Sequence, residues 1–178
     1  MPRTLLVTGF GPFGDVADNP ASRLARALDG AAHAGFHIVG REIPVSYTRG
    51  IDATVRLAHE HRADCVLGVG VATTRSTIQL ERLARGSSGP TPDVDGICTP
   101  VLPGPDCLES SLPVDLWAAA LGCEVSDDAG RYVCNAWLHQ VRQQLAVPVG
   151  FLHVPPAGAD PVWFLDGLVR LVTSPDVP

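Results

Sequence analysis

Four short apolar runs constrain the fold of this chain more than any other feature of its sequence. Each is rich in β-branched residues, is bounded by Gly or Pro, and is too short for a typical amphipathic helix. Runs of this kind are typical of strands that are buried on both faces, as in a parallel sheet. The four predicted strands cover residues 4–8, 36–39, 65–69 and 149–154.

Helical patterns alternate with these strands. Asn19 followed by Pro20 resembles a helix N-cap with proline in the first helical position, which predicts a helix at 21–28. The alternation indicates the α/β class, as one three-layer α/β/α domain over residues 1–178 around a mostly parallel twisted sheet. The remaining predictions are helices at about 47–61, 113–121, 131–145 and 160–172, a strand at 77–84, and a long Gly- and Pro-rich loop at 86–105.

The charge of the chain is acidic and evenly spread. Its 13 basic residues, all of them Arg, are scattered among 19 acidic ones and leave a net charge of −6. A nucleic-acid binder gathers its basic residues into a patch or stripe, so we expect no nucleic-acid partner. No apolar run approaches the roughly 18 residues that a membrane-spanning helix needs, so no membrane association is expected.

The cysteine pattern argues against a disulfide framework and against a zinc ribbon. Five cysteines form an odd set without any C-x-x-C pair. The segment MPRTLLVTGFGPFG breaks into glycines and has no small-residue cleavage motif, so we interpret it as the first core strand rather than as a signal peptide. We therefore expect a cytoplasmic protein that uses neither a metal nor another cofactor.

A glycine-rich loop follows the first predicted strand. Residues 9–14, GFGPFG, match the G-x-G-x-x-G pattern of dinucleotide sites, which would suit a nucleotide-dependent oxidoreductase with Glu42 as the ribose acid. In that motif the helix starts inside the glycine run, whereas here the helix signal comes five residues after Gly14 and Pro12 removes an amide. The rings of Phe10 and Phe13 either plug the end of the sheet or form the wall of a small-molecule pocket.

Cys134 is a candidate nucleophile because a helix is predicted to begin at or just before it, after the turn signal Ala129-Gly130. Free amides at a helix N-terminus stabilise a thiolate and can bind an oxyanion. The alternative is a buried free cysteine that packs as a small apolar side chain.

A histidine and a glutamate are the other candidates. His153 ends a predicted strand just before two prolines, and the carboxyl ends of parallel strands form the edge where α/β proteins bind ligands. A histidine there can act as a general base. Glu81 lies in an apolar strand-like run, where a carboxylate needs a partner; the alternative to a catalytic role is an ion pair with Arg82 or Arg85.

Four stretches in order along the chain resemble the pyroglutamyl peptidase I (pyrrolidone carboxyl peptidase) family of cysteine peptidases. They are TGFGPFG with Asn19-Pro20, GVGVATTRSTIQLERLA, AGRYVCN and GFLHVP, and they cover the chain almost end to end. The resemblance implies that Cys134 attacks the amide carbonyl after an amino-terminal pyroglutamate, that His153 takes the thiol proton, and that Glu81 orients His153. An acyl-enzyme is then hydrolysed. The alternative is a relative that binds pyroglutamate without catalysis, or acts on another substrate.

The resemblance also implies a substrate pocket and an assembly. Peptides with amino-terminal pyroglutamate are the expected partners, and a homo-oligomer is expected. Apart from the resemblance, we expect exposed apolar surface on residues 112–117 or on the last helix to form the subunit contact. The lactam ring is expected in an apolar pocket of Phe10, Phe13, Tyr132 and Val133, with Asn19 and the backbone of Val71 at the lactam amide.

Two of the departures from the family pattern bear directly on the site. Where the family usually has GQAGGR, residues 70–75 keep the first Gly and the Arg but replace the Gln and both later glycines. A family Arg thought to support the active site aligns near Pro90, and this chain has no positive charge between Arg85 and Arg131. Both departures predict altered positioning of the substrate and weaker stabilisation of charge in the transition state.

Overall fold

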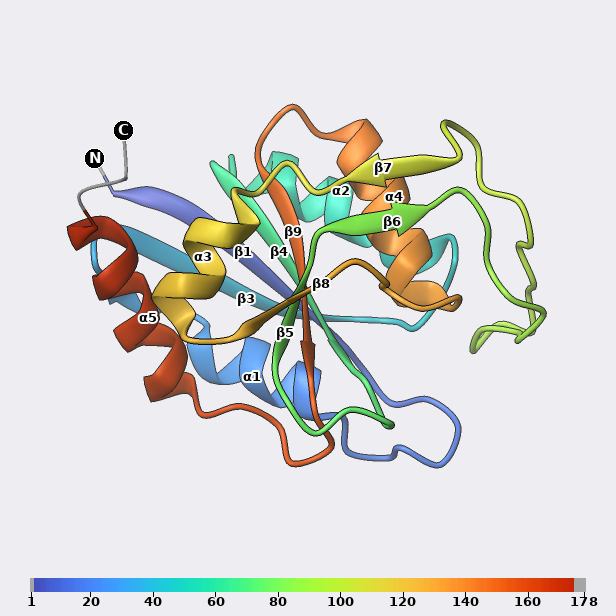
Figure 1. Cartoon of the computed structure of the whole chain (residues 1–178), viewed down its shortest axis with the longest axis horizontal. Helices are drawn as coiled ribbons and strands as arrows, with labels where there is room; N and C mark the ends of the chain where they lie inside the picture. Colours follow the sequence, from blue (N-terminus) through green and yellow to red (C-terminus); the bar gives the residue numbers. More distant parts are fainter. Residues whose placement is uncertain (1, 175–178) are drawn as a thin grey trace.

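Seven strands form one twisted sheet in the computed structural model, which describes residues 2–174 (Figure 1). Their order is β2-β3-β1-β4-β9-β5-β8. Strands β3, β1, β4 and β9 are parallel, β2 and β5 pair antiparallel to their neighbours β3 and β9, and β8 is parallel to β5. The strands are β1 (Arg3–Phe10), β2 (Ala32–His33), β3 (Phe36–Ile43), β4 (Cys65–Val71), β5 (Gln79–Glu81), β8 (Glu124–Ser126) and β9 (Val149–Val154).

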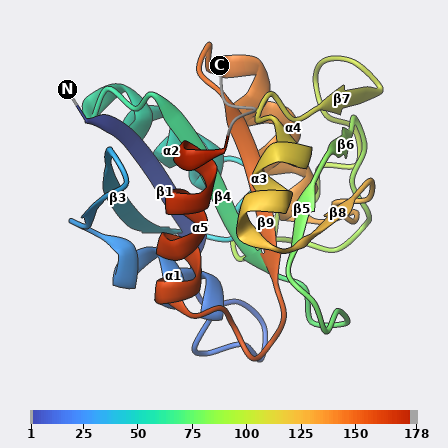
Figure 2. The same cartoon turned by 60° about the vertical axis from the view of Figure 1, so that its left-hand side comes forward.

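Helices cover both faces of this sheet. The side chains of β1 alternate, since Leu5 and Val7 pack on one face and Leu6 and Phe10 on the other. Figure 2 shows α5, α3 and α1 on one side of the sheet, and α2 and α4 pack on the opposite side. The helices are α1 (Pro20–Leu28), α2 (Arg49–Glu60), α3 (Val114–Leu121), α4 (Val133–Gln144) and α5 (Pro161–Thr173).

The predicted α/β class with a mostly parallel sheet is confirmed, and one predicted strand is wrong. The run at 77–84 is divided at Arg82 into β5 and β6 (Leu83–Arg85), and β6 pairs antiparallel with β7 (Cys107–Glu109) in a separate two-stranded sheet. At the break, Arg82 directs its guanidinium to Asp115 and Asp127.

Asn19 fixes the glycine-rich loop to the first helix. Its Oδ1 accepts the N–H of Ala21 at 2.9 Å, which caps α1 as predicted. Its Nδ2 donates to the carbonyl of Gly11 at 2.9 Å. Gly9 packs so closely on this helix that a Cβ there would lie 2.2 Å from the carbonyl oxygen of Ala21, so no other residue fits.

Residues 86–106, here called the arm, extend between β6 and β7 away from the sheet (Figure 1). The buried side chain of Asn135 holds the base of the arm to α4. Its Oδ1 accepts the N–H of Arg85 at 2.7 Å, and its Nδ2 donates to the carbonyls of Arg85 (2.9 Å) and Ser87 (3.1 Å). These bonds fix the base of the arm relative to the start of α4.

Replacing Asn135 with Leu is expected to lower the free energy of unfolding by about 2–4 kcal/mol, because one donor and two acceptors in a partly buried place lose their partner. Urea denaturation followed by circular dichroism measures the change. Limited proteolysis should also cut the arm sooner in the variant. Unchanged stability and unchanged cleavage of the arm would show that this anchor has no energetic weight.

Candidate active site

The register of two neighbouring strands places Cys134 and His153 close to the same point of the sheet. Strand β4 is parallel to β9, and Gly70 is the register partner of His153. A Cβ on Gly70 would lie 2.8 Å from Cys134 Sγ and 2.9 Å from the ring of Phe151, whose centroid is 5.0 Å from that of His153. The sulfur therefore lies over β4 beside the histidine, in a space that exists because residue 70 has no side chain.

His153 and Glu81 form a buried pair. Nδ1 of His153 is 2.6 Å from Oε1 of Glu81, and the two residues are 4% and 0% exposed. The partner strands are β9 and β5, which are antiparallel neighbours. Because a carboxylate only accepts hydrogen bonds, Nδ1 carries the proton and Nε2 is left with a lone pair that can accept another.

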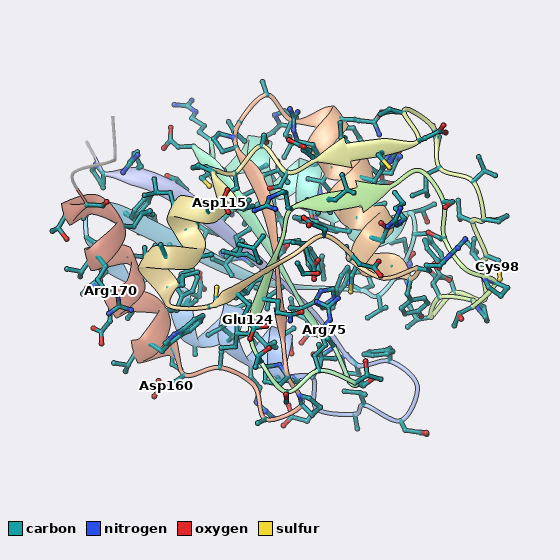
Figure 3. All side chains as sticks on the ribbon, in the orientation of Figure 1. Arg75, Cys98, Asp115, Glu124, Asp160 and Arg170 are labelled. Atoms are coloured by element: carbon teal, nitrogen blue, oxygen red, sulfur yellow. The ribbon has the colours of Figure 1, made fainter. Side chains whose placement is uncertain are left out.

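Arg75, which is labelled in Figure 3, lies in the loop between β4 and β5. It is the second partner of this carboxylate. Its Nη1 donates to the same Oε1 of Glu81 at 2.5 Å, and its Nη2 donates to the carbonyl of Asp128 at 2.5 Å. The alternative ion pair of Glu81 with Arg82 is wrong, since Arg82 pairs with Asp115 and Asp127. Local sequence gave no sign of the contact between residues 75 and 81.

Cys134 is the second residue of α4, as the predicted helix start requires, and it is partly buried. Burial raises the pKa of its thiol to about 12, and the negative charge of Glu81 raises that pKa further, while its own backbone N–H and the positive charge of Arg75 act in the opposite direction. The backbone amide at the helix N-terminus does lower the pKa of the thiol, but the effect of burial is larger. At neutral pH the resting sulfur carries its proton, so attack by this sulfur needs a base.

The thiol and the imidazole are neighbours without being bonded. Within residues 2–174, no hydrogen bond joins Cys134 Sγ to His153. Hydrogen bonds of catalytic groups are often long or misaligned in a free enzyme and tighten only with substrate bound.

A hollow of ≈ 380 Å³ opens between the glycine-rich loop and the arm. Phe13 and Tyr132 line it with ring centroids 6.2 Å apart, and Tyr47 supports Tyr132 in an edge-on contact at 6.0 Å. The hydroxyl of Tyr132 donates to the carbonyl of Pro92 in the arm at 3.1 Å. The opposite wall is made by arm residues that the sequence analysis missed: Thr91, Pro92, Asp93 and Val94.

The other four predicted pocket residues lie elsewhere. Phe10 is almost fully buried and packs on Phe151 at 6.1 Å, and Val133 is fully buried as the first residue of α4. Asn19 is buried, with its oxygen and its amide nitrogen both bonded within the chain. Val71 ends β4 beside Val154 of β9. None of the four lines the hollow.

Within residues 2–174, no cluster of three or more His, Cys, Asp or Glu side chains is placed to hold a metal ion. The helices of the same range are too short or too polar to span a bilayer.

The glycine-rich loop packs against the side chain of Glu42. Oε1 of Glu42 lies 3.0 Å from the place that a Cβ on Gly11 would take, and its other carboxylate oxygen pairs with Arg26.

Replacing Gly70 with Ala is expected to reduce kcat about 10²-fold, because the new methyl group would displace the sulfur of Cys134. Gly68→Ala is the matched control. Gly68 lies in the same strand as Gly70. A Cβ there would lie 2.6 Å from the rings of Phe151 and Trp137 but would not crowd the sulfur. Both variants should lose stability by about 1–3 kcal/mol, and only Gly70→Ala should lose most of its activity. Equal activity losses would contradict this placement of the thiol.

Known proteins resemble this chain in both sequence and fold. A family model described as pyroglutamyl peptidase, peptidase family C15, matches residues 3–160. Pyrrolidone-carboxylate peptidase from Vibrio campbellii is 33% identical over 94% of this chain and 88% of its own length. The protein of that name from Levilactobacillus brevis is 37% identical over 85% of this chain and 81% of its own length.

Solved structures agree. The pyroglutamyl peptidase I from Bacillus amyloliquefaciens has a TM-score of 0.86 over 98% of this chain and 97% of its own, at 24% identity, which shows the fold alone. The pyrrolidone carboxyl peptidase from Thermococcus litoralis has a TM-score of 0.82 over 96% of this chain and 91% of its own, at 26% identity.

The family model and the relatives define a hydrolase of the cysteine peptidase class. The relatives match this chain through most of their length as well as its own. The chain belongs to the pyroglutamyl peptidase family, as its four motifs predicted. This membership removes the reason to interpret the glycine-rich loop as a nucleotide site.

Proposed function

We propose that this chain hydrolyses the amide bond after an amino-terminal pyroglutamate, with Cys134 as nucleophile, His153 as base and Glu81 as the acid that orients His153. The observation that carries the proposal is the buried bond of 2.6 Å between His153 Nδ1 and Glu81, beside the sulfur that rests over Gly70. That bond leaves Nε2 of the imidazole as the acceptor for the thiol proton.

The proposed reaction has two halves. The sulfur of Cys134 attacks the amide carbonyl while Nε2 of His153 takes its proton, and the carboxylate of Glu81 stabilises the imidazolium that forms. Free amides in the first turn of α4 stabilise the oxyanion. The imidazolium then gives its proton to the leaving amine, and a thioester remains on the sulfur. Water activated by the same imidazole hydrolyses the thioester.

The proposed selectivity depends on the missing charge of the substrate. Pyroglutamate has a neutral lactam instead of an ammonium group, so it fits a hollow walled by Phe13, Tyr132 and the arm. A pocket built for an ammonium would leave its own buried acid unpaired with this ligand. Phe10, Val133, Asn19 and the backbone of Val71 do not line this hollow, so in this proposal they contact the lactam only where it reaches beyond the hollow, with Asn19 and Val71 at its amide.

One observation favours the second candidate, a relative that binds pyroglutamate without turnover or acts on another substrate. Residues 86–130, which include the arm, contain no Arg, Lys or His. The site therefore lacks a cation from the arm that could stabilise charge in the transition state. Calorimetry with free pyroglutamate, on a chain that shows no turnover, would identify this candidate.

The deciding experiment uses a pyroglutamyl arylamide and follows the released arylamine. Prolyl arylamide is the matched control substrate, because it has a five-membered ring of similar size but a charged amine. We expect turnover of the first and none of the second, with full inhibition by iodoacetamide. Folded protein that releases no arylamine at high enzyme concentration would contradict the proposal.

We also infer a reducing compartment such as the cytoplasm, and assembly as a homo-oligomer. All five cysteines are free thiols, which supports the first inference. The expectation of an exposed apolar surface at 112–117 is wrong at Leu112 and Trp117, because both are buried. On α5, in contrast, Val162 is 59% and Val169 40% exposed. Sedimentation of the wild type and of Val162→Glu tests whether this helix forms a subunit contact.

A further inference from the structure

Arg75 joins two parts of the site that are far apart in the chain. Its Nη1 donates a hydrogen bond to Oε1 of Glu81, and its Nη2 donates one to the carbonyl of Asp128. Its side chain is 22% exposed, whereas that of Glu81 is 0% exposed. A planar guanidinium can hold two acceptors at once in this way, and an ammonium cannot do so with the same geometry.

The carboxylate of Glu81 depends on few donors. Its Oε1 accepts from both Arg75 and His153, while its Oε2 is buried and has no hydrogen-bond partner within residues 2–174. A buried carboxylate is costly unless opposite charge and donors compensate for lost water. Arg75 supplies a permanent positive charge beside the carboxylate and, through its hydrogen bond to Oε1, helps to hold it in place beside His153.

The carbonyl of Asp128 belongs to the turn that leads into α4. Asp128 donates its N–H to Ser126 Oγ at 3.1 Å and accepts the N–H of Gly130 on Oδ1 at 3.1 Å. Gly130 has a positive φ of 80°, and Tyr132 follows as the N-cap of α4. The position of this turn therefore sets the position of Cys134, which is the second residue of α4.

The charge of Arg75 also acts on the sulfur. The carboxylate of Glu81 raises the pKa of the Cys134 thiol, and the positive charge of Arg75 lowers it. Loss of Arg75 alone would leave the sulfur facing an unbalanced negative charge.

We propose that Arg75 is a positioning residue of this site: it fixes the spacing between the Glu81–His153 pair and the sulfur of Cys134, and offsets the repulsion between carboxylate and thiolate. The role in catalysis rests on the proposed peptidase function. The effect of Arg75 on the reactivity of the Cys134 sulfur does not rest on that function, and it can be measured without any substrate.

Three variants test the proposal. Arg75→Gln removes the charge and the double contact, and Arg75→Lys keeps the charge. Arg82→Gln is the matched control, because Arg82 also joins two acceptors near β5, Asp115 and Asp127, but outside the site. The readouts are kcat and KM on a pyroglutamyl arylamide, the rate of alkylation of Cys134 by iodoacetamide, and the thermal unfolding midpoint.

Alkylation can be assigned to one cysteine. Trypsin cuts after Arg131 and Arg142, and the peptide 132–142 contains Cys134 and no other cysteine. Mass spectrometry of this peptide therefore reports the reactivity of the proposed nucleophile even if the chain turns over no substrate.

For Arg75→Gln we expect alkylation about tenfold slower at pH 8, kcat lower by about 30- to 100-fold, and KM within about threefold of wild type. Arg75→Lys should restore the alkylation rate but only part of kcat, because the ammonium cannot hold both acceptors. Arg82→Gln should resemble wild type in both readouts. If Arg75→Gln does not fold, the split between alkylation and kcat in Arg75→Lys carries the test.

The inference would be overturned if Arg75→Gln had the same alkylation rate and kcat as the wild type. It would also be overturned if Arg82→Gln lost as much of both as Arg75→Gln does. A different result would separate the two proposals. If alkylation depends on Arg75 as described and the wild type hydrolyses no pyroglutamyl arylamide, the positioning of the sulfur is supported and the peptidase function fails.

Discussion

Replacing Cys134 with Ala is expected to reduce the hydrolysis of a pyroglutamyl arylamide by about 10⁴-fold or more. The reason is that the proposed covalent route needs the sulfur of Cys134, which lies beside the His153–Glu81 pair. The residue is only partly buried and packs over a glycine, so loss of the sulfur should change the unfolding midpoint little. Initial rates on matched amounts of folded protein measure the effect.

Cys123→Ala is the control for this experiment. Cys123 is also partly buried, and burial raises the pKa of its thiol to about 11, but it lies next to β8 outside the site. This variant should retain wild-type activity. Measurable turnover by Cys134→Ala, at a rate that scales with the variant's concentration, would assign the nucleophile elsewhere.

Replacing His153 with Ala is expected to lower kcat by about 10³-fold, with a smaller change in KM, because the protonated thiol of Cys134 loses its base. Burial and Glu81 raise the pKa of that thiol to about 12, so below this pH each unit of pH increases its thiolate fraction about tenfold. The residual rate of the variant should therefore rise steeply from pH 7 to 10, in contrast to the wild type.

The exposed His59 provides the control, and His59→Ala should match the wild type across the pH range. A flat pH profile for His153→Ala would mean that hydroxide does not replace the lost base. A variant with full activity would remove His153 from the mechanism.

The main elements of the fold were predictable because they are long enough to show a pattern. The cap Asn19-Pro20 and the buried runs of β1 and β9 carry their own local signals. A strand of three residues such as β5 or β8 has no measurable periodicity, so neither the break at Arg82 nor the antiparallel pairing of β5 could be predicted.

The candidate site was only partly predictable, for a different reason. Each of Cys134, His153 and Glu81 is ambiguous on its own, and the resemblance to a family is what joined them. Contacts that depend on tertiary structure left no trace in the sequence: the bond of Arg75 to Glu81, the wall that the arm adds to the hollow, and the burial that raises the pKa of the Cys134 thiol.

The most direct test of the account is to capture the acyl-enzyme. Wild-type enzyme is mixed with excess pyroglutamyl arylamide, quenched with acid within milliseconds, digested at low pH and examined by mass spectrometry. We predict a pyroglutamyl group in thioester linkage on Cys134, labile to hydroxylamine, and more of it when deacylation is slowed. Turnover that proceeds without this adduct, or an adduct on another residue, would contradict the account.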